Sequence, residues 1–148
     1  MFNVSMYTDG SCFRNGSETA IGGYCAILTF GTHERIIHGY ESRTTNNRME
    51  LRAIIEGVKA LKAPSSITVY TDSMYVVKGA ASLRSWLKDS RPHANMDLWQ
   101  ELIDAGKQGK HRLSFQHVPG HSGNPMNERC DKIARNQSLQ GSIFNMCS

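Results

Sequence analysis

Ile67-Thr68-Val69-Tyr70-Thr71 is a short run in which apolar and polar side chains alternate, and Asp72-Ser73 ends it. Alternation with a period of two is typical of a β-strand that has one buried face. Ser73 is a residue type that begins helices, so we expect a helix to open directly after the strand. A strand that passes straight into a helix indicates a fold in which helices pack on a sheet.

The residues before this junction predict a meander of strands and one long helix. Alternation and apolar residues recurring every three or four positions predict strands at residues 4–8, 22–30 and 35–40 and a helix at 49–61. We interpret Asp9-Gly10-Ser11 as a turn that ends the first strand. Thr44-Thr45-Asn46-Asn47 offers residues that cap the helix, and Pro64 stops it.

The residues after the junction predict further helices at 96–106 and 125–138 and a strand at 113–118. The resulting order, β-β-β-α-β-α-α-β-α, predicts an α/β fold with a five-stranded mixed sheet. A three-stranded antiparallel meander and two parallel strands would form the sheet, with helices on both faces. We expect one domain over residues 1–138 and a weakly ordered tail over residues 139–148.

The composition suits one globular domain, because 39% of the 148 residues are hydrophobic and 20% are charged. A net charge of +4 permits a polyanionic partner without requiring one. No apolar run approaches the ~18 residues of a membrane span, and the first residues do not resemble a signal peptide, so we expect no membrane partner. Cys12, Cys25, Cys130 and Cys147 are far apart, which disfavours a disulfide framework or a zinc site and favours a cytoplasmic location.

Four acidic residues flank the predicted elements. Asp9 and Asp72 follow strands, Glu50 lies in the first turn of the predicted helix 49–61, and Asp131 lies in the last helix. If the strands at 4–8 and 67–71 are adjacent and parallel, the carboxylates would meet at one edge of the sheet and bind hard divalent cations. Helix capping, the helix dipole and a solvated face are the alternative explanations of the same residues. Spacing alone leaves both interpretations open.

Six ordered motifs lie between about Asn3 and Arg135, and they include all four acidic residues. The motifs are Tyr7-Thr8-Asp9-Gly10-Ser11-Cys12, Gly22-Gly23-Tyr24-Cys25-Ala26-Ile27-Leu28, Thr44-Thr45-Asn46-Asn47-Arg48-Met49-Glu50-Leu51, Tyr70-Thr71-Asp72-Ser73-Met74-Tyr75-Val76, Asp97-Leu98-Trp99, and residues 119–131 from Pro119-Gly120-His121 to Cys130-Asp131. This ordered set resembles type 1 ribonuclease H. The resemblance implies a ribonuclease H-like fold.

The resemblance also implies an endonuclease that cuts the RNA strand of an RNA–DNA hybrid and leaves 5′-phosphate and 3′-hydroxyl ends. Asp9 would bridge two Mg²⁺ ions, which Mn²⁺ can replace. Asp131 would hold the ion that activates water, and Glu50 and Asp72 would help to hold the other ion. His121 would assist turnover, a role that suits a neutral histidine near pH 7. The expected partner is the hybrid, bound by a monomer.

The same resemblance implies two groups of substrate contacts. The first group, near the minor groove of the hybrid, comprises Asn15, Asn46, Asn47 and the backbone of Cys12. The second group, around a phosphate of the DNA strand, comprises Arg43, Thr45 and Asn95. Helix capping is the alternative role for Asn46 and Asn47, and simple surface exposure is the alternative for Arg43 and Asn95.

The stretch from Ala80 to Asn95 is shorter than the basic, Trp-rich handle with which many relatives grip the hybrid. Trp86 within it could stack on the DNA strand or belong to the core. Two other functions remain in competition: a non-catalytic nucleic-acid-binding module, and a DNA nuclease of the transposase or integrase type. A degenerate module should lack at least one of the four carboxylates, and none is missing.

Overall fold

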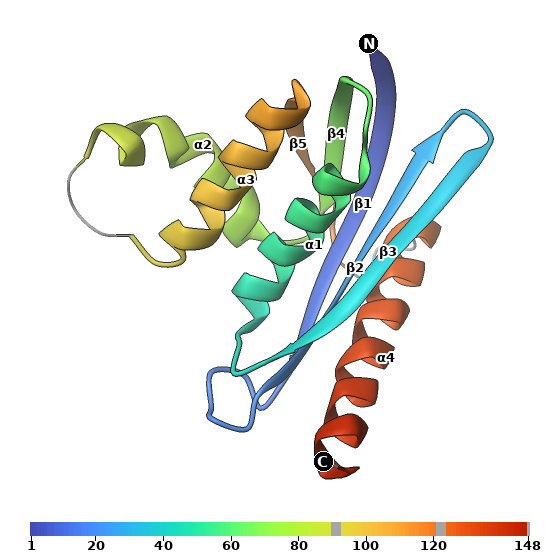
Figure 1. The fold of residues 1–148 in the computed structure, drawn as a ribbon, viewed down its shortest axis with the longest axis vertical. Helices are drawn as coiled ribbons and strands as arrows, with labels where there is room; N and C mark the ends of the chain where they lie inside the picture. The colour runs from blue at the N-terminus through green and yellow to red at the C-terminus, as the bar shows by residue number, and fades with distance from the viewer. Residues whose placement is uncertain (90–92, 121–123, 148) are drawn as a thin grey trace.

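A computed structural model describes residues 1–89, 93–120 and 124–147 of the chain. Its elements, in chain order, are β1 (Phe2–Phe13), β2 (Ile21–Phe30), β3 (His33–Ser42), α1 (Asn46–Ala60), β4 (Ser65–Thr71), α2 (Met74–Lys88), α3 (Met96–Gly109), β5 (Arg112–His117) and α4 (Pro125–Cys147). This is the order that the sequence predicts (Figure 1).

The five strands form one mixed sheet in the order β3-β2-β1-β4-β5. β2 pairs antiparallel with both β1 and β3, whereas β4 pairs parallel with both β1 and β5. The predicted meander and the two parallel strands are therefore confirmed. β1 lies at the centre, where the antiparallel half of the sheet meets the parallel half.

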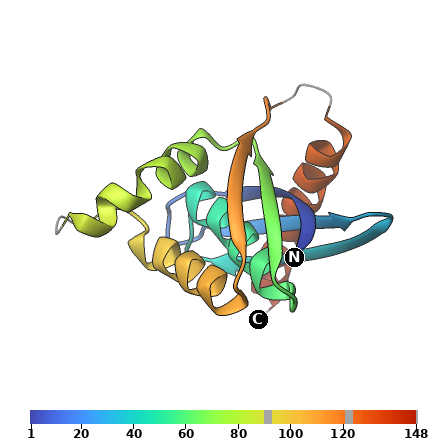
Figure 2. The ribbon, with the colours of Figure 1, turned by 90° about the horizontal axis from the view of Figure 1, so that it is seen from above.

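Helices cover both faces of the sheet. α2 and α3 lie on one side of β4 and β5, and α4 lies on the other side (Figure 2). The larger core cluster joins the sheet to α1, α2 and α3 and includes Met6, Ile54, Val69 and Trp99. A smaller cluster between α4 and β2 contains Cys25, Ile27, Cys130 and Ala134. No helix in the described ranges is both long enough and apolar enough to cross a membrane.

The predicted end of the first strand at Asp9 is wrong. β1 continues to Phe13, with Asp9 opposite Cys25 of β2 and Phe13 opposite Ile21. Its parallel ladder with β4, however, stops at the pair Tyr7–Tyr70. The sequence Asp-Gly-Ser is a local turn signal, but here an antiparallel neighbour continues the strand beyond it. Asp9 therefore lies at the point where β1 and β4 part, rather than at a strand end.

The predicted end of the last helix at Ser138 is also wrong, because α4 continues to Cys147. The added turns lie against β2 and β3: a Cβ atom on Gly141 would lie 2.6 Å from the Tyr40 ring and 2.8 Å from Ile21 Cγ2. The residue that makes this contact, Gly141, is small, and the buried Ser138 just before the added turns is polar. Hydrophobic periodicity does not register such an interface.

Candidate metal centre and substrate-binding face

Three carboxylates converge where β1 and β4 part. One oxygen from each of Asp9, Glu50 and Asp72 lies within 4.8 Å of the other two. Asp9 extends from the middle of β1, and Asp72 follows the last residue of the neighbouring parallel strand β4. Glu50 is the fifth residue of α1 and therefore lies beyond its first turn, not within it as predicted. The adjacent parallel strands bring Asp9 and Asp72 together, as the sequence predicts.

The capping alternatives fail for the two aspartates. No helix follows β1 directly, so Asp9 caps none. The N-cap of α2 is Ser73, whose hydroxyl accepts a hydrogen bond of 3.2 Å from the backbone N–H of Val76. Asp72 is thus available to face the other carboxylates.

Burial makes the cluster electrostatically costly. Asp9 and Glu50 are only 4% and 8% exposed. Burial, together with the charge of Asp72 and a hydrogen bond with Asp131, raises the pKa of Asp9 to about 8. Burial and the charges of Asp9 and Asp72 raise the pKa of Glu50 as well. Among the described residues, Glu50 Oε2 has no hydrogen-bond partner although it is buried. These groups fit a hard divalent cation, which would bind the oxygens and neutralise their charge.

Asp131 lies next to this cluster on α4. It shares a small pocket with Asp72, and its carboxylate pairs with Arg135 Nε at 3.2 Å, one helical turn further on. It is not one of the three residues whose oxygens lie within 4.8 Å of one another. His121 is outside the described residues.

The raised pKa of Asp9 predicts how the metal-free protein responds to pH. The carboxyl ordinarily titrates near 3.8 and in the folded protein near 8. Between these values the folded state holds a proton that the unfolded state has lost, so this contribution to stability is complete below pH 3.8 and is lost as the pH rises through 8. We expect Asp9→Asn, which has no such titration, to melt higher than wild type in EDTA, by a margin that grows from about pH 5 to about pH 9. A margin independent of pH in thermal unfolding would contradict this assignment.

Most of the predicted minor-groove contacts lie together at the start of α1. Asn15 Oδ1 accepts a hydrogen bond of 2.8 Å from the backbone N–H of Asn46, and Cys12 Sγ lies 3.6 Å from the Thr44 carbonyl. The loop after β1 is thereby fastened to the N-terminus of α1. Asn46 and Asn47 are exposed, and neither caps α1. The cap is Thr45, whose hydroxyl accepts from the Arg48 N–H at 3.2 Å.

The predicted phosphate contacts also surround the start of α1. Arg43 is exposed and has a φ of 53°. Asn95 comes from the N-cap of α3, and its Oδ1 accepts a hydrogen bond of 3.2 Å from Arg48 Nη1. Arg48 has no role predicted from the sequence, because its partners Asn95 and Asp97 lie 47 and 49 residues away and leave no local pattern.

Trp86 is partly buried, and its ring contacts other aromatic side chains. Its ring stacks on His93 with centroids 4.7 Å apart and meets Trp99 edge-on at 6.1 Å. It also packs against the larger core cluster. The core interpretation of Trp86 is therefore favoured over stacking on a DNA strand.

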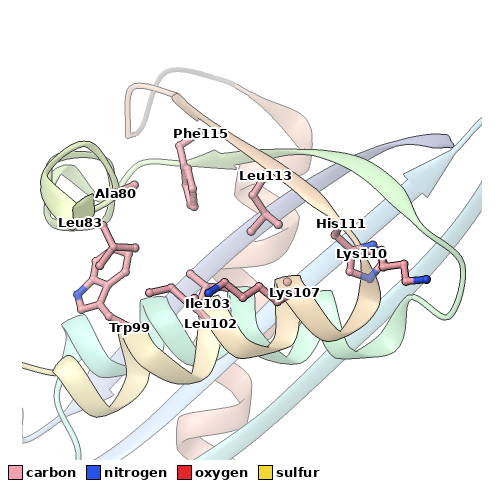
Figure 3. A pocket seen from close by; sticks show the side chains of 11 residues that line it. Ala80, Leu83, Trp99, Leu102, Ile103, Lys107, Lys110, His111, Leu113 and Phe115 are labelled. Carbon is pink, nitrogen blue, oxygen red and sulfur yellow. The ribbon is translucent and has the colours of Figure 1, made fainter. Parts of the chain in front are cut away.

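A separate apolar pocket of about 280 Å³ lies between α2, α3 and β5. Figure 3 shows Leu83, Trp99, Leu102 and Phe115 around it, and none of the four carboxylates lines it. By shape alone, this pocket would be the candidate functional site. The chemistry of the side chains identifies the carboxylate cluster as the candidate instead.

Comparisons with known proteins give a family match over nearly the whole chain. The family model for RNase H matches residues 2–139. A ribonuclease H of Caldicellulosiruptor saccharolyticus is 45% identical over 143 residues, which span 91% of this chain and 95% of the relative. A ribonuclease H of Thermus thermophilus is 44% identical over 143 residues, which span 91% of this chain and 83% of the relative.

Solved structures show the same fold. The crystal structure of LC9-RNase H1, described as a type 1 RNase H with the type 2 active-site motif, is 29% identical, with a TM-score of 0.79 over 95% of this chain and 74% of that chain. LC11-RNase H1, solved in complex with an RNA/DNA hybrid, has a TM-score of 0.71 over 93% of this chain and 98% of that chain. At 20% identity this second likeness concerns the fold alone.

Proposed function

The chain belongs to the ribonuclease H family, and on that premise we propose that it is an endonuclease that hydrolyses the RNA strand of RNA–DNA hybrids. The proposal includes two divalent cations, Mg²⁺ with Mn²⁺ as a substitute, and products with 5′-phosphate and 3′-hydroxyl ends. The observation that carries it is the convergence of Asp9, Glu50 and Asp72 within 4.8 Å, two of them buried.

The proposed two ions are assigned to the four acidic residues. Asp9 interacts with each of the other three carboxylates and would bridge both ions, Glu50 and Asp72 would hold one, and Asp131 would hold the other. When bound, the cations supply charge neutralisation at the phosphodiester and activation of water for in-line attack. The burial that raises the pKa of Asp9 and Glu50 also weakens the screening of their charges by water. A nearby cation would therefore stabilise the ionised carboxylates strongly. His121 would assist turnover.

Strand choice rests on the start of α1. A nuclease for hybrids must detect 2′-hydroxyls on one strand and deoxyribose on the other. Asn15, Asn46, Asn47 and the backbone of Cys12 would contact the minor groove, where the amides can donate and accept hydrogen bonds. Arg43, Thr45 and Asn95 would bind a phosphate of the DNA strand. A cytoplasmic location and a monomeric state stay predictions from the sequence.

One assay tests the proposed activity. The purified protein is incubated with end-labelled RNA–DNA hybrid, double-stranded RNA or double-stranded DNA, each with Mg²⁺, with Mn²⁺ or with EDTA. We expect cleavage of the hybrid's RNA strand with either metal, no cleavage in EDTA, and no cleavage of the other duplexes. Hybrid binding without cleavage would identify a non-catalytic module, and cleavage of double-stranded DNA would identify a DNA nuclease.

A further inference from the structure

The Asn95 side chain makes hydrogen bonds other than the one expected of a residue at a helix N-cap. It is the N-cap of α3, with the left-handed backbone angles φ 63° and ψ 24°. Asparagine at this position usually caps the helix with its side chain, which stabilises the helix by about 1 kcal/mol. Here the Asn95 side chain makes no capping hydrogen bond. It is committed instead to groups on two other helices.

Those groups fix the orientation of the Asn95 amide. Its Oδ1 accepts from Arg48 Nη1 of α1 at 3.2 Å, and its Nδ2 donates to the Tyr75 hydroxyl of α2 at 2.9 Å. A guanidinium only donates hydrogen bonds, so the amide oxygen must face Arg48 and the amide nitrogen must face Tyr75. A flipped amide would place its NH₂ group against the guanidinium and lose the hydrogen bond with Arg48.

The Tyr75 hydroxyl is itself saturated. It donates to the carbonyl of Ala94 at 3.3 Å and accepts from Asn95 Nδ2 and from Trp99 Nε1, the latter at 3.1 Å. One donor and two acceptor positions are all that a hydroxyl offers. In Figure 3 the Trp99 nitrogen lies on the edge of the indole that points away from the apolar pocket. The buried Trp99 thus anchors Tyr75 to the core.

Arg48 is fixed from its other side. Its Nη1 and Nη2 donate to the two oxygens of Asp97 at 3.0 and 2.7 Å, a two-pronged ion pair that links the first turn of α1 to the start of α3. Asp97 neutralises the guanidinium, and the hydrogen bond from Arg48 lowers the pKa of Asp97. With its charge paired, Arg48 serves to orient Asn95 rather than to anchor an anion by itself.

We propose that Tyr75 and the Arg48–Asp97 pair are positioning residues that hold the Asn95 amide so that its second Nδ2 hydrogen is presented to a phosphate of the hybrid's DNA strand. Within the described ranges that hydrogen has no protein acceptor. The inference rests on the proposed function, which places Asn95 at this phosphate. It adds three residues that do not themselves contact the substrate, and it explains why Asn95 does not cap α3.

The test measures hybrid binding in the Asp9→Asn background, so that bound substrate is not cut. Fluorescence anisotropy with a labelled hybrid gives Kd for Tyr75→Phe, Asn95→Ala and the combination of the two. Tyr75→Phe removes one hydroxyl and keeps the ring. Loss of one well-placed hydrogen bond corresponds to a rise in Kd of about five- to tenfold. We expect that rise for each single variant and no further rise when Tyr75→Phe is added to Asn95→Ala.

A second test leaves the Tyr75 hydroxyl in place and changes the Arg48–Asp97 pair. Replacing Arg48 and Asp97 together by Ala keeps the net charge, and we expect it to weaken binding only while Asn95 is present. Tyr24→Phe is the matched control, because Tyr24 lies on β2 outside this network, and it should leave Kd unchanged. Circular dichroism melts verify that each variant is folded.

The outcomes separate this inference from the proposed activity. Equal weakening by Tyr75→Phe with and without Asn95, or no weakening at all, overturns the positioning role while leaving cleavage by wild type unaffected. Conversely, a wild-type protein that binds hybrid with the expected coupling but never cuts it overturns the proposed activity and supports the positioning role. If the wild-type protein fails to bind hybrid at all, both are contradicted.

Discussion

Asp9→Asn is expected to reduce cleavage of an RNA–DNA hybrid by at least about 10³-fold while leaving the fold intact. Asp9 is the central carboxylate of the proposed metal centre, and an amide has neither the charge nor the second anionic oxygen needed to bridge two cations. Loss of one group that stabilises developing charge commonly costs about 10²–10³-fold, and loss of a bridging ligand should cost more. Single-turnover cleavage with excess protein measures the effect without interference from product release.

The control for this prediction is Asp104→Asn on α3. Asp104 is an exposed carboxylate that accepts a hydrogen bond from Gln100 and is not among the clustered carboxylates. It should cleave at the wild-type rate, which shows that removal of one negative charge from the surface is harmless. Near-normal cleavage by a folded Asp9→Asn protein would remove Asp9 from the mechanism.

Gly10→Ala is the second substitution with a large expected effect, because it changes both stability and activity. A Cβ atom at this position would lie 2.5 Å from the backbone nitrogen of Glu50 and 2.6 Å from the carbonyl carbon of Met49. These are backbone atoms, so α1 as a whole must move away from β1. Overpacking of this kind typically costs about 1–3 kcal/mol. The helix that moves is the one that carries Glu50, and a misplacement of about 1 Å in a reacting constellation can cost about 10²-fold in rate.

We therefore expect Gly10→Ala to lower the free energy of unfolding by about 1–3 kcal/mol and to lower cleavage by about 10²-fold, measured by urea unfolding and by the hybrid assay at a temperature where the variant is folded. Gly106→Ala is the matched control. Gly106 is a buried glycine within α3, where a Cβ atom would meet only Leu113 Cδ1 at an ordinary 3.6 Å. It should gain stability from helix propensity and keep full activity. Equal behaviour of the two variants would show that close approach at Gly10 does not matter.

The positions of the carboxylates show how far local patterns reach. Asp72 follows a strand with clear alternation, and Ser73 is a recognisable cap, so this corner of the site could be predicted from a few residues. The local pattern predicts a turn at Asp9, because Asp-Gly-Ser usually forms one. Asp9 lies within β1 because β2 provides hydrogen-bonding partners for residues 9–13. Most of these partner residues are more than ten positions away in the sequence.

The end of α4 shows a second limit. Ser138 and Gly141 are buried against the sheet, yet neither is a hydrophobic residue that would register in a helical period. Close packing of small residues depends on the shape of the opposite surface, here Ile21 and the ring of Tyr40. The position at which α4 ends therefore depends on its contact with β2 and β3, and the residues of the helix alone do not reveal that contact.

The sequence by itself determined the order of the elements and the mixed sheet, because alternation, helical period and capping residues are properties of neighbours in the chain. The motifs that resemble ribonuclease H singled out the four acidic positions. Only the tertiary structure decided that Asp9, Glu50 and Asp72 lie within 4.8 Å, that burial raises the pKa of Asp9 and Glu50, and that Asn95 faces Arg48 and Tyr75. Desolvation and directed hydrogen bonds depend on which distant segments meet, and at what angle. The local sequence around each of these residues does not show which distant residues it will contact.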